Sequence, residues 1–188
     1  MASGQPRPKT IRPVLRWGIP ALAGASLAVA LVLVLHRPAP DTLTKGSEWR
    51  LGVIAKTKQG SVMRLDPGAP LAPGDRLRFE VFTIWPKAEI ALVLLDSAGQ
   101  VTQLAPSGER SLTIAGGRRV LLDGAVELDA GLGPERITLV ACGQPMQTAE
   151  VVASAQRALA AAHGDPRQVS DLGTGCHEET FWISKVSQ

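Results

Sequence analysis

The sequence lacks the short motifs that mark the common catalytic and nucleotide-binding sites. It contains no G-x-S-x-G, no G-x-x-x-x-G-K-[ST], no H-E-x-x-H and no G-x-G-x-x-G after an expected strand. These patterns are typical of serine hydrolases, P-loop proteins, zinc proteases and dinucleotide-binding folds. The paired glycines of GLGPER and GTGCHE lack the flanking strand and helix that a phosphate site needs. We therefore expect no enzymatic activity and no cofactor.

Acidic residues are absent from the first 37 positions, where five of the 20 basic residues lie. All 17 acidic residues follow, so the charges of the remaining chain nearly balance. A nucleic-acid surface needs clustered Lys and Arg, and only the neighbours Arg118 and Arg119 suggest such a cluster. We expect no nucleic-acid partner, and we interpret the sequence pI of 9.2 as a targeting signature.

Charge is also absent from the eighteen residues between Gly18 and Leu35, which two arginines flank. A helix of that length covers about 27 Å, close to the thickness of a hydrocarbon core. Trp17 in the interface and snorkelling arginines would close the gap. The sequence therefore predicts a transmembrane signal-anchor helix over residues 18–36, which contacts membrane lipid.

Two alternatives to a permanent anchor stay open, a cleaved signal peptide and a buried soluble helix. The apolar run is longer than that of most signal peptides, and Pro38 and Pro40 make a poor cleavage site. A homodimer is a further alternative, because small residues at a spacing of four would let two such helices approach closely. These residues are Ala21 with Ala25, and Gly24 with Ala28.

The basic N-terminus orients the chain through the positive-inside rule. Residues 1–17 are then a cytoplasmic tail, and the Pro-rich residues 37–48 are a linker. Residues 49–188 form an extracytoplasmic β-rich domain, periplasmic or extracellular, of a single-pass protein of the bacterial inner membrane.

Alternating apolar and polar residues predict strands from Trp49 onward. Leu51, Val53 and Ala55 share one face of the first strand, and Leu77, Phe79 and Val81 share one face of another. Their neighbours are polar, which predicts an antiparallel sheet with one wet face. EIALVLLD and ERITLVAC are nearly continuous apolar runs, as expected of strands covered on both faces.

The later chain adds two expected hairpins, one helix and a last strand. Ser97 to Gly99 turn the chain into QVTQL, and the Gly116–Gly117 turn joins SLTI to RRVLL. Val151, Val152, Ala155, Leu159 and Ala162 have helical spacing, with Thr148 as N-cap and Gly164 at the C-terminal cap. TFWISKV closes the chain. The fold class is mainly β, an antiparallel β-sandwich or barrel of about seven strands with one late α-helix, preceded by the N-terminal transmembrane helix.

Three segments, PGDRLRFEVF, ALVLLDSAGQVTQLAP and VELDAGLGPERITLVAC, resemble the bacterial domain-of-unknown-function family 4384. The resemblance covers about residues 50–145. It implies an extracytoplasmic module without enzymatic activity. The residue types alone predict that Pro73, Gly74 and Asp75 form a turn before a strand. In this turn the aspartate would accept hydrogen bonds from the backbone.

Two cysteines in an oxidising compartment favour a disulfide between Cys142 and Cys176. It would enclose about 34 residues and contribute about 3 to 4 kcal/mol of stability. Two unpaired thiols are the alternative. A zinc site with His177 is poorly supported without a C-x-x-C spacing. Neighbouring residues of an extended chain point to opposite faces, so Cys176 and His177 could not form a dyad with each other.

Asp123, Glu127 and Asp129 are close in sequence, but solvated surface positions are the expected use of carboxylates among glycines. We therefore expect no catalytic, cofactor-binding or metal site in this chain. The first functional hypothesis is a non-catalytic domain that binds or senses an envelope component or partner protein. The alternatives are an anchored or secreted hydrolase that uses Cys176 and His177, and a structural protein that adds strands at a sheet edge or through Trp85.

Overall fold

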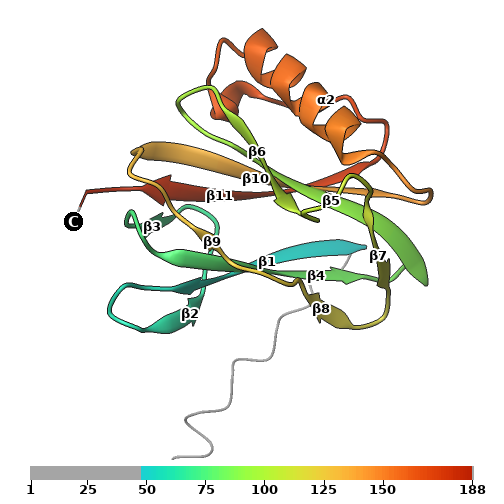
Figure 1. Ribbon diagram of the computed structural model, residues 1–188, viewed down its shortest axis with the longest axis horizontal. Helices are drawn as coiled ribbons and strands as arrows, with labels where there is room; N and C mark the ends of the chain where they lie inside the picture. Colours follow the sequence, from blue (N-terminus) through green and yellow to red (C-terminus); the bar gives the residue numbers. More distant parts are fainter. Residues whose placement is uncertain (1–47, 188) are drawn as a thin grey trace, which may run out of the picture. The chain divides into compact units, whose positions relative to one another are not determined.

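The computed structural model describes residues 48–187. The expected cytoplasmic tail, the anchor over residues 18–36 and nearly all of the linker lie outside the described residues. Within residues 48–187, no helix is both long and apolar enough to cross a membrane. The described chain is mainly β, as expected, and contains two sheets and one α-helix (Figure 1).

Sheet A has the strand order β2-β1-β4-β8, and β9 pairs with the same edge of β4 as β8 does. Its pairings are all antiparallel. The strands are β1 (Trp49–Lys56), β2 (Val62–Arg64), β4 (Arg76–Thr83), β8 (Arg119–Leu121) and β9 (Val126–Glu127).

Sheet B has the order β3-β11-β10-β5-β6, with β7 also pairing with β5. One pairing, between β3 and β11, is parallel, which the expectation of a purely antiparallel fold missed. The strands are β3 (Ala69–Leu71), β5 (Lys87–Leu95), β6 (Val101–Ala105), β7 (Leu112–Ala115), β10 (Gly133–Cys142) and β11 (His177–Lys185).

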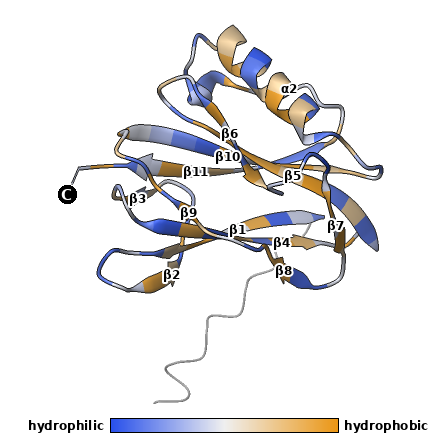
Figure 2. Ribbon diagram, in the orientation of Figure 1, coloured by the Kyte–Doolittle hydropathy of each residue, from blue (hydrophilic) through white to orange (hydrophobic). Residues whose placement is uncertain are grey.

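The two sheets pack face to face around one apolar core, so the fold is a sandwich of two sheets. Leu51, Val53 and Ala55 of β1 point inward, as the alternation predicted, and their neighbours point outward. Hydrophobic segments run along the strands of both sheets, as Figure 2 shows in orange. Sheet B contributes side chains such as Ile90 and Leu139. As predicted, β5 and β10 are buried on both faces, because sheet B lies between two layers.

The third layer is α2 (Thr148–Ala161), which covers the face of sheet B that is turned away from sheet A (Figure 1). Val151, Ala155 and Leu159 pack on Val93 and Val140 of the sheet in a second apolar cluster. A short 3-10 helix, η1 (Pro166–Gln168), follows.

The predicted caps of α2 need correction. The N-cap is Gln147, because the hydroxyl of Thr148 donates to the carbonyl of Gly108 and does not cap the helix. At the other end, the N–H of Gly164 donates to Leu159 and the N–H of His163 to Ala160, which is a Schellman pattern. His163 takes the first left-handed position with φ of 54°.

The hairpin expected around Gly116 and Gly117 is wrong. β7 pairs with β5 in sheet B, whereas β8 pairs with β4 in sheet A, so the turn carries the chain from one sheet to the other. There it passes close to the β4–β5 connection. A Cβ on Gly116 would lie 1.6 Å from the carbonyl oxygen of Trp85, so only glycine fits.

Asp75 has the structural role that its turn predicts. Its side chain is buried and accepts hydrogen bonds from the backbone N–H groups of Lys58 and Ala72, at 3.1 and 3.0 Å. Gly74 before it has φ of 86°, a left-handed conformation that favours glycine. The turn therefore fixes where β4 begins.

Candidate binding surface

The outward face of sheet A gathers basic side chains from four strands that are distant in sequence. In β1 and β4 these are the residues that alternate with the buried ones, and the strand register brings β2 and β8 onto the same face. It holds six of the chain's 20 Lys and Arg residues and only two of its 17 acidic residues, Glu80 and Glu127. We call it the basic face; its cations are Arg50, Lys56, Arg64, Arg76, Arg78 and Arg119.

The two carboxylates neutralise only part of this charge. Glu80 lies between two arginines, with its Oε1 at 2.9 Å from Arg64 and 3.7 Å from Arg119. Glu127 pairs with Arg76 at 3.0 Å, and both side chains are more than half exposed. Such exposed pairs contribute about 1 kcal/mol or less to stability. The basic face therefore keeps an excess of positive charge, and its exposed Arg76–Glu127 pair can be exchanged for a ligand at small cost.

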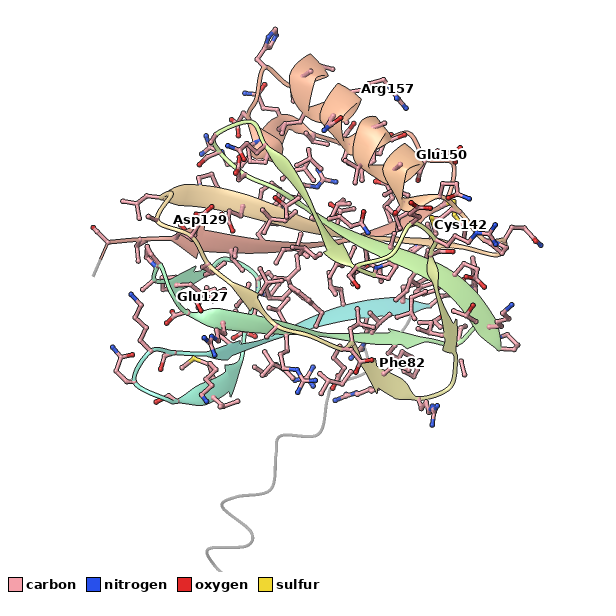
Figure 3. All side chains as sticks on the ribbon, in the orientation of Figure 1. Phe82, Glu127, Asp129, Cys142, Glu150 and Arg157 are labelled. Carbon is pink, nitrogen blue, oxygen red and sulfur yellow. A yellow bond between two sulfur atoms is a disulfide. The ribbon has the colours of Figure 1, made fainter. Side chains whose placement is uncertain are left out.

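Apolar side chains lie among these cations. Phe82 is opposite Arg50 on one side and Arg119 on the other in the strand register, and Leu121 is opposite Glu80. Leu121 is 43% exposed, whereas Phe82 and Ile54 are half-buried. Figure 3 shows Phe82 on sheet A and Glu150 and Arg157 on α2, on opposite sides of sheet B. The surface thus combines guanidinium groups with an aromatic and aliphatic floor.

The basic face corrects one step of the sequence argument. The absence of a basic cluster was the reason to expect no nucleic-acid partner, and the structure shows a larger cluster than the neighbours Arg118 and Arg119. Because each strand supplies only one or two of the cations, no window of sequence reveals it. The basic face could have been recognised from the two arginines that alternate with apolar residues in RLRFE, together with the arginine on the solvent-facing side of WRLG. The exclusion of nucleic acid stays a prediction that now rests on the expected extracytoplasmic location.

The predicted disulfide is present between Cys142 and Cys176, with Cα atoms 5.1 Å apart. It joins the end of β10 to the segment before β11 and so encloses α2. The sulfur of Cys176 is not a free nucleophile while this bond exists. His177 stacks on Trp49 with ring centroids 5.5 Å apart, and its Nε2 lies 3.9 Å from Glu179.

Trp85 is half-buried, so it is less exposed than the strand-addition hypothesis assumed. Its ring makes an edge contact with Trp49, with centroids 5.0 Å apart. Its indole N–H donates to Glu48 at 3.0 Å. The ring and the indole N–H of Trp85 are therefore both engaged in contacts within the fold.

The carboxylates Asp123, Glu127 and Asp129 do not form a shared site. Glu127 pairs with Arg76 on the basic face. Asp129, in the loop between β9 and β10, forms an ion pair with Lys185 at the end of β11. Asp123 is exposed. Within the part of the chain that the structure describes, no group of three or more His, Cys, Asp and Glu side chains is placed to hold a metal ion.

Two buried carboxylates have shifted acidities for structural reasons. Burial raises the pKa of Glu135 although the ammonium of Lys185 lies beside it. Burial alone would also raise the pKa of Glu89, but hydrogen bonds from Thr113 and Ser111 and the charge of Lys87 lower it below its ordinary value. The partners of both groups are side chains that tie strands and loops together.

Comparison of the sequence with protein-family models gives no match, and comparison with curated proteins gives none either.

Proposed function

We propose that this chain is a single-pass membrane protein whose β-sandwich lies outside the cytoplasm and binds an anionic envelope component without catalysing a reaction. The observation that carries the proposal is the basic face, which concentrates six cations on one open sheet surface. Arginine is suited to this role because its planar guanidinium group donates two parallel hydrogen bonds to phosphate or carboxylate.

The disulfide supports the location. Disulfides persist in oxidising compartments, and the bond between Cys142 and Cys176 would be unusual in a reducing cytosol. The apolar segment 18–36 and the basic tail before it supply the anchor and its orientation. The resemblance to the domain-of-unknown-function family 4384 agrees with the same arrangement.

The alternative, a hydrolase that uses Cys176 and His177, gains no support from the geometry. Its nucleophile would have to be released from the disulfide, and His177 packs on Trp49.

Site-specific photo-crosslinking in cells tests the proposal. A photoreactive amino acid at Leu121, on the basic face, should form adducts with an envelope component, whereas the same group at the exposed Gln156 of α2 should form far fewer. In cells whose outer layer has been opened, added protease should degrade residues 38–188. Complete protection from protease would show the opposite topology, and equal crosslinking at both positions would remove the basic face as the binding surface.

A further inference from the structure

We propose that the anionic component is phospholipid, and that the basic face lies flat on the surface of the bilayer that anchors the chain. This inference rests on the proposed function, since it uses the predicted anchor. It is supported by the charge of the basic face, by the shape of that face, and by its distance along the chain from the predicted anchor.

The charge of the basic face is complementary to that of an anionic bilayer. Each Lys or Arg near an anionic bilayer strengthens association by roughly fivefold. The basic face carries six cations against two carboxylates, so several of these contributions act in the same direction. Most of the acidic residues lie elsewhere, for example Glu150 on α2, and an anionic surface would repel them. The charge distribution therefore orients the body as well as attracting it.

The shape and chemistry of the basic face also suit a membrane surface. An open sheet face can place many side chains at one depth, which suits a planar array of phosphate groups. Phe82, Ile54 and Leu121 lie between the cations and can contact the boundary between headgroups and acyl chains. This mixture of basic and apolar side chains is typical of surfaces that lie in the membrane interface.

The basic face also begins close to the predicted anchor along the chain. Arg50 is the second residue of β1 and already belongs to the basic face. The predicted linker, residues 37–48, has twelve residues and can reach no farther than about 43 Å. A tether this short gives the face a local concentration at the bilayer that is on the order of millimolar. Weak electrostatic contacts are then sufficient for docking.

The docked orientation leaves the other side of the molecule open. α2 lies beyond sheet B, on the side away from the basic face (Figure 1), and the bonded Cys142 and Cys176 pack against the same apolar cluster as α2. They would point away from the bilayer, where they remain accessible to a second partner.

Fluorescence quenching on the full-length chain in vesicles tests the inference. Leu121→Cys places one free thiol on the basic face, because both native cysteines are bonded to each other. An NBD label there should be quenched by lipids that carry a nitroxide near the headgroup, in vesicles that contain phosphatidylglycerol. The matched label at Gln156→Cys on α2 should not be quenched.

Charge reversal supplies the control for electrostatics. Lys56→Glu with Arg78→Glu changes the basic face, and Arg110→Glu with Arg157→Glu makes the same change at exposed positions elsewhere. The first pair should abolish quenching at Leu121→Cys in phosphatidylglycerol vesicles, and the second should leave it unchanged. Circular dichroism spectra identical to that of the parent chain confirm that the variants fold.

The outcomes separate this inference from the proposed function. If carbonate washing removes the chain from vesicles, the anchor is wrong. If the chain resists washing but the Leu121→Cys label is not quenched, the anchor stands and docking is refuted. If the label is quenched equally in phosphatidylcholine vesicles, or if the face instead binds soluble dextran sulfate or DNA, the commitment to anionic phospholipid is wrong.

Discussion

Lys185 and Glu135 carry opposite charges at one end of the core between the sheets. Because both are buried, each charge is compensated by the other. Their exposed fractions are 5% and 2%. Asp129, which is largely exposed, contacts the same ammonium group from the β9–β10 loop. A buried pair of this kind adds little net stability, but removing one partner leaves a buried charge without compensation.

Lys185→Met should therefore destabilise the fold by about 3 to 5 kcal/mol at pH 8. The loss should shrink as the pH falls toward 5. In the folded state the pKa of Glu135 is already raised from 4.5 by burial, and removing the ammonium raises it further. In the folded variant, Glu135 therefore binds a proton at a higher pH than it does in the unfolded variant. Protonation removes the buried negative charge, and the loss of stability that this charge caused disappears with it.

Urea unfolding at several pH values measures both effects. Lys185→Met combined with Glu135→Gln should recover most of the loss and should lack the pH dependence. Arg76→Met, which breaks only the exposed pair with Glu127, should change stability by less than about 1 kcal/mol. A Lys185→Met loss that is the same at pH 8 and pH 5 would contradict this account.

At the level of strands and helices, the sequence predicts what local periodicity determines. Alternation identifies β1 and β4 and their inward residues, and helical spacing identifies α2. The partners of β7 and β8 are not local, because both segments alternate in the same way and a glycine turn suits either a hairpin or a crossing between sheets. The basic face was missed for the same reason, since strand pairing alone brings Arg50, Arg64 and Arg119 together.

The disulfide acts at this scale by holding the α2 segment against sheet B. Cys142→Ser and Cys176→Ser should each lower stability by about 3 to 4 kcal/mol, as expected for a loop that spans 34 residues. The double variant should lose no more than either single variant, because all three lack the same bond. Urea unfolding measures the losses, and a reducing agent should destabilise only the parent chain. Additive losses in the double variant would indicate two independent thiol contributions.

At the scale of the whole molecule, positive charge is concentrated on one outer layer. The basic face lies on the outside of sheet A, while α2 covers the opposite side of sheet B (Figure 1). A chain with little net charge can therefore still present a strongly positive surface in one direction. Net charge and pI describe such a molecule poorly, because association with an anionic surface depends on the face that approaches it.

Removing one carboxylate from the basic face should therefore strengthen docking even though the net charge changes by only one. Glu127→Gln should raise the salt concentration that releases the Leu121→Cys label from phosphatidylglycerol vesicles. Salt weakens the attraction between exposed charges and largely screens charges separated by more than about 10 Å at 0.1 M. Glu150→Gln makes the same change in net charge on α2 and should leave that salt concentration unchanged. The measurement is a salt titration of nitroxide quenching for both variants. An equal increase in both would mean that net charge, and not the arrangement of cations on sheet A, governs association with the bilayer.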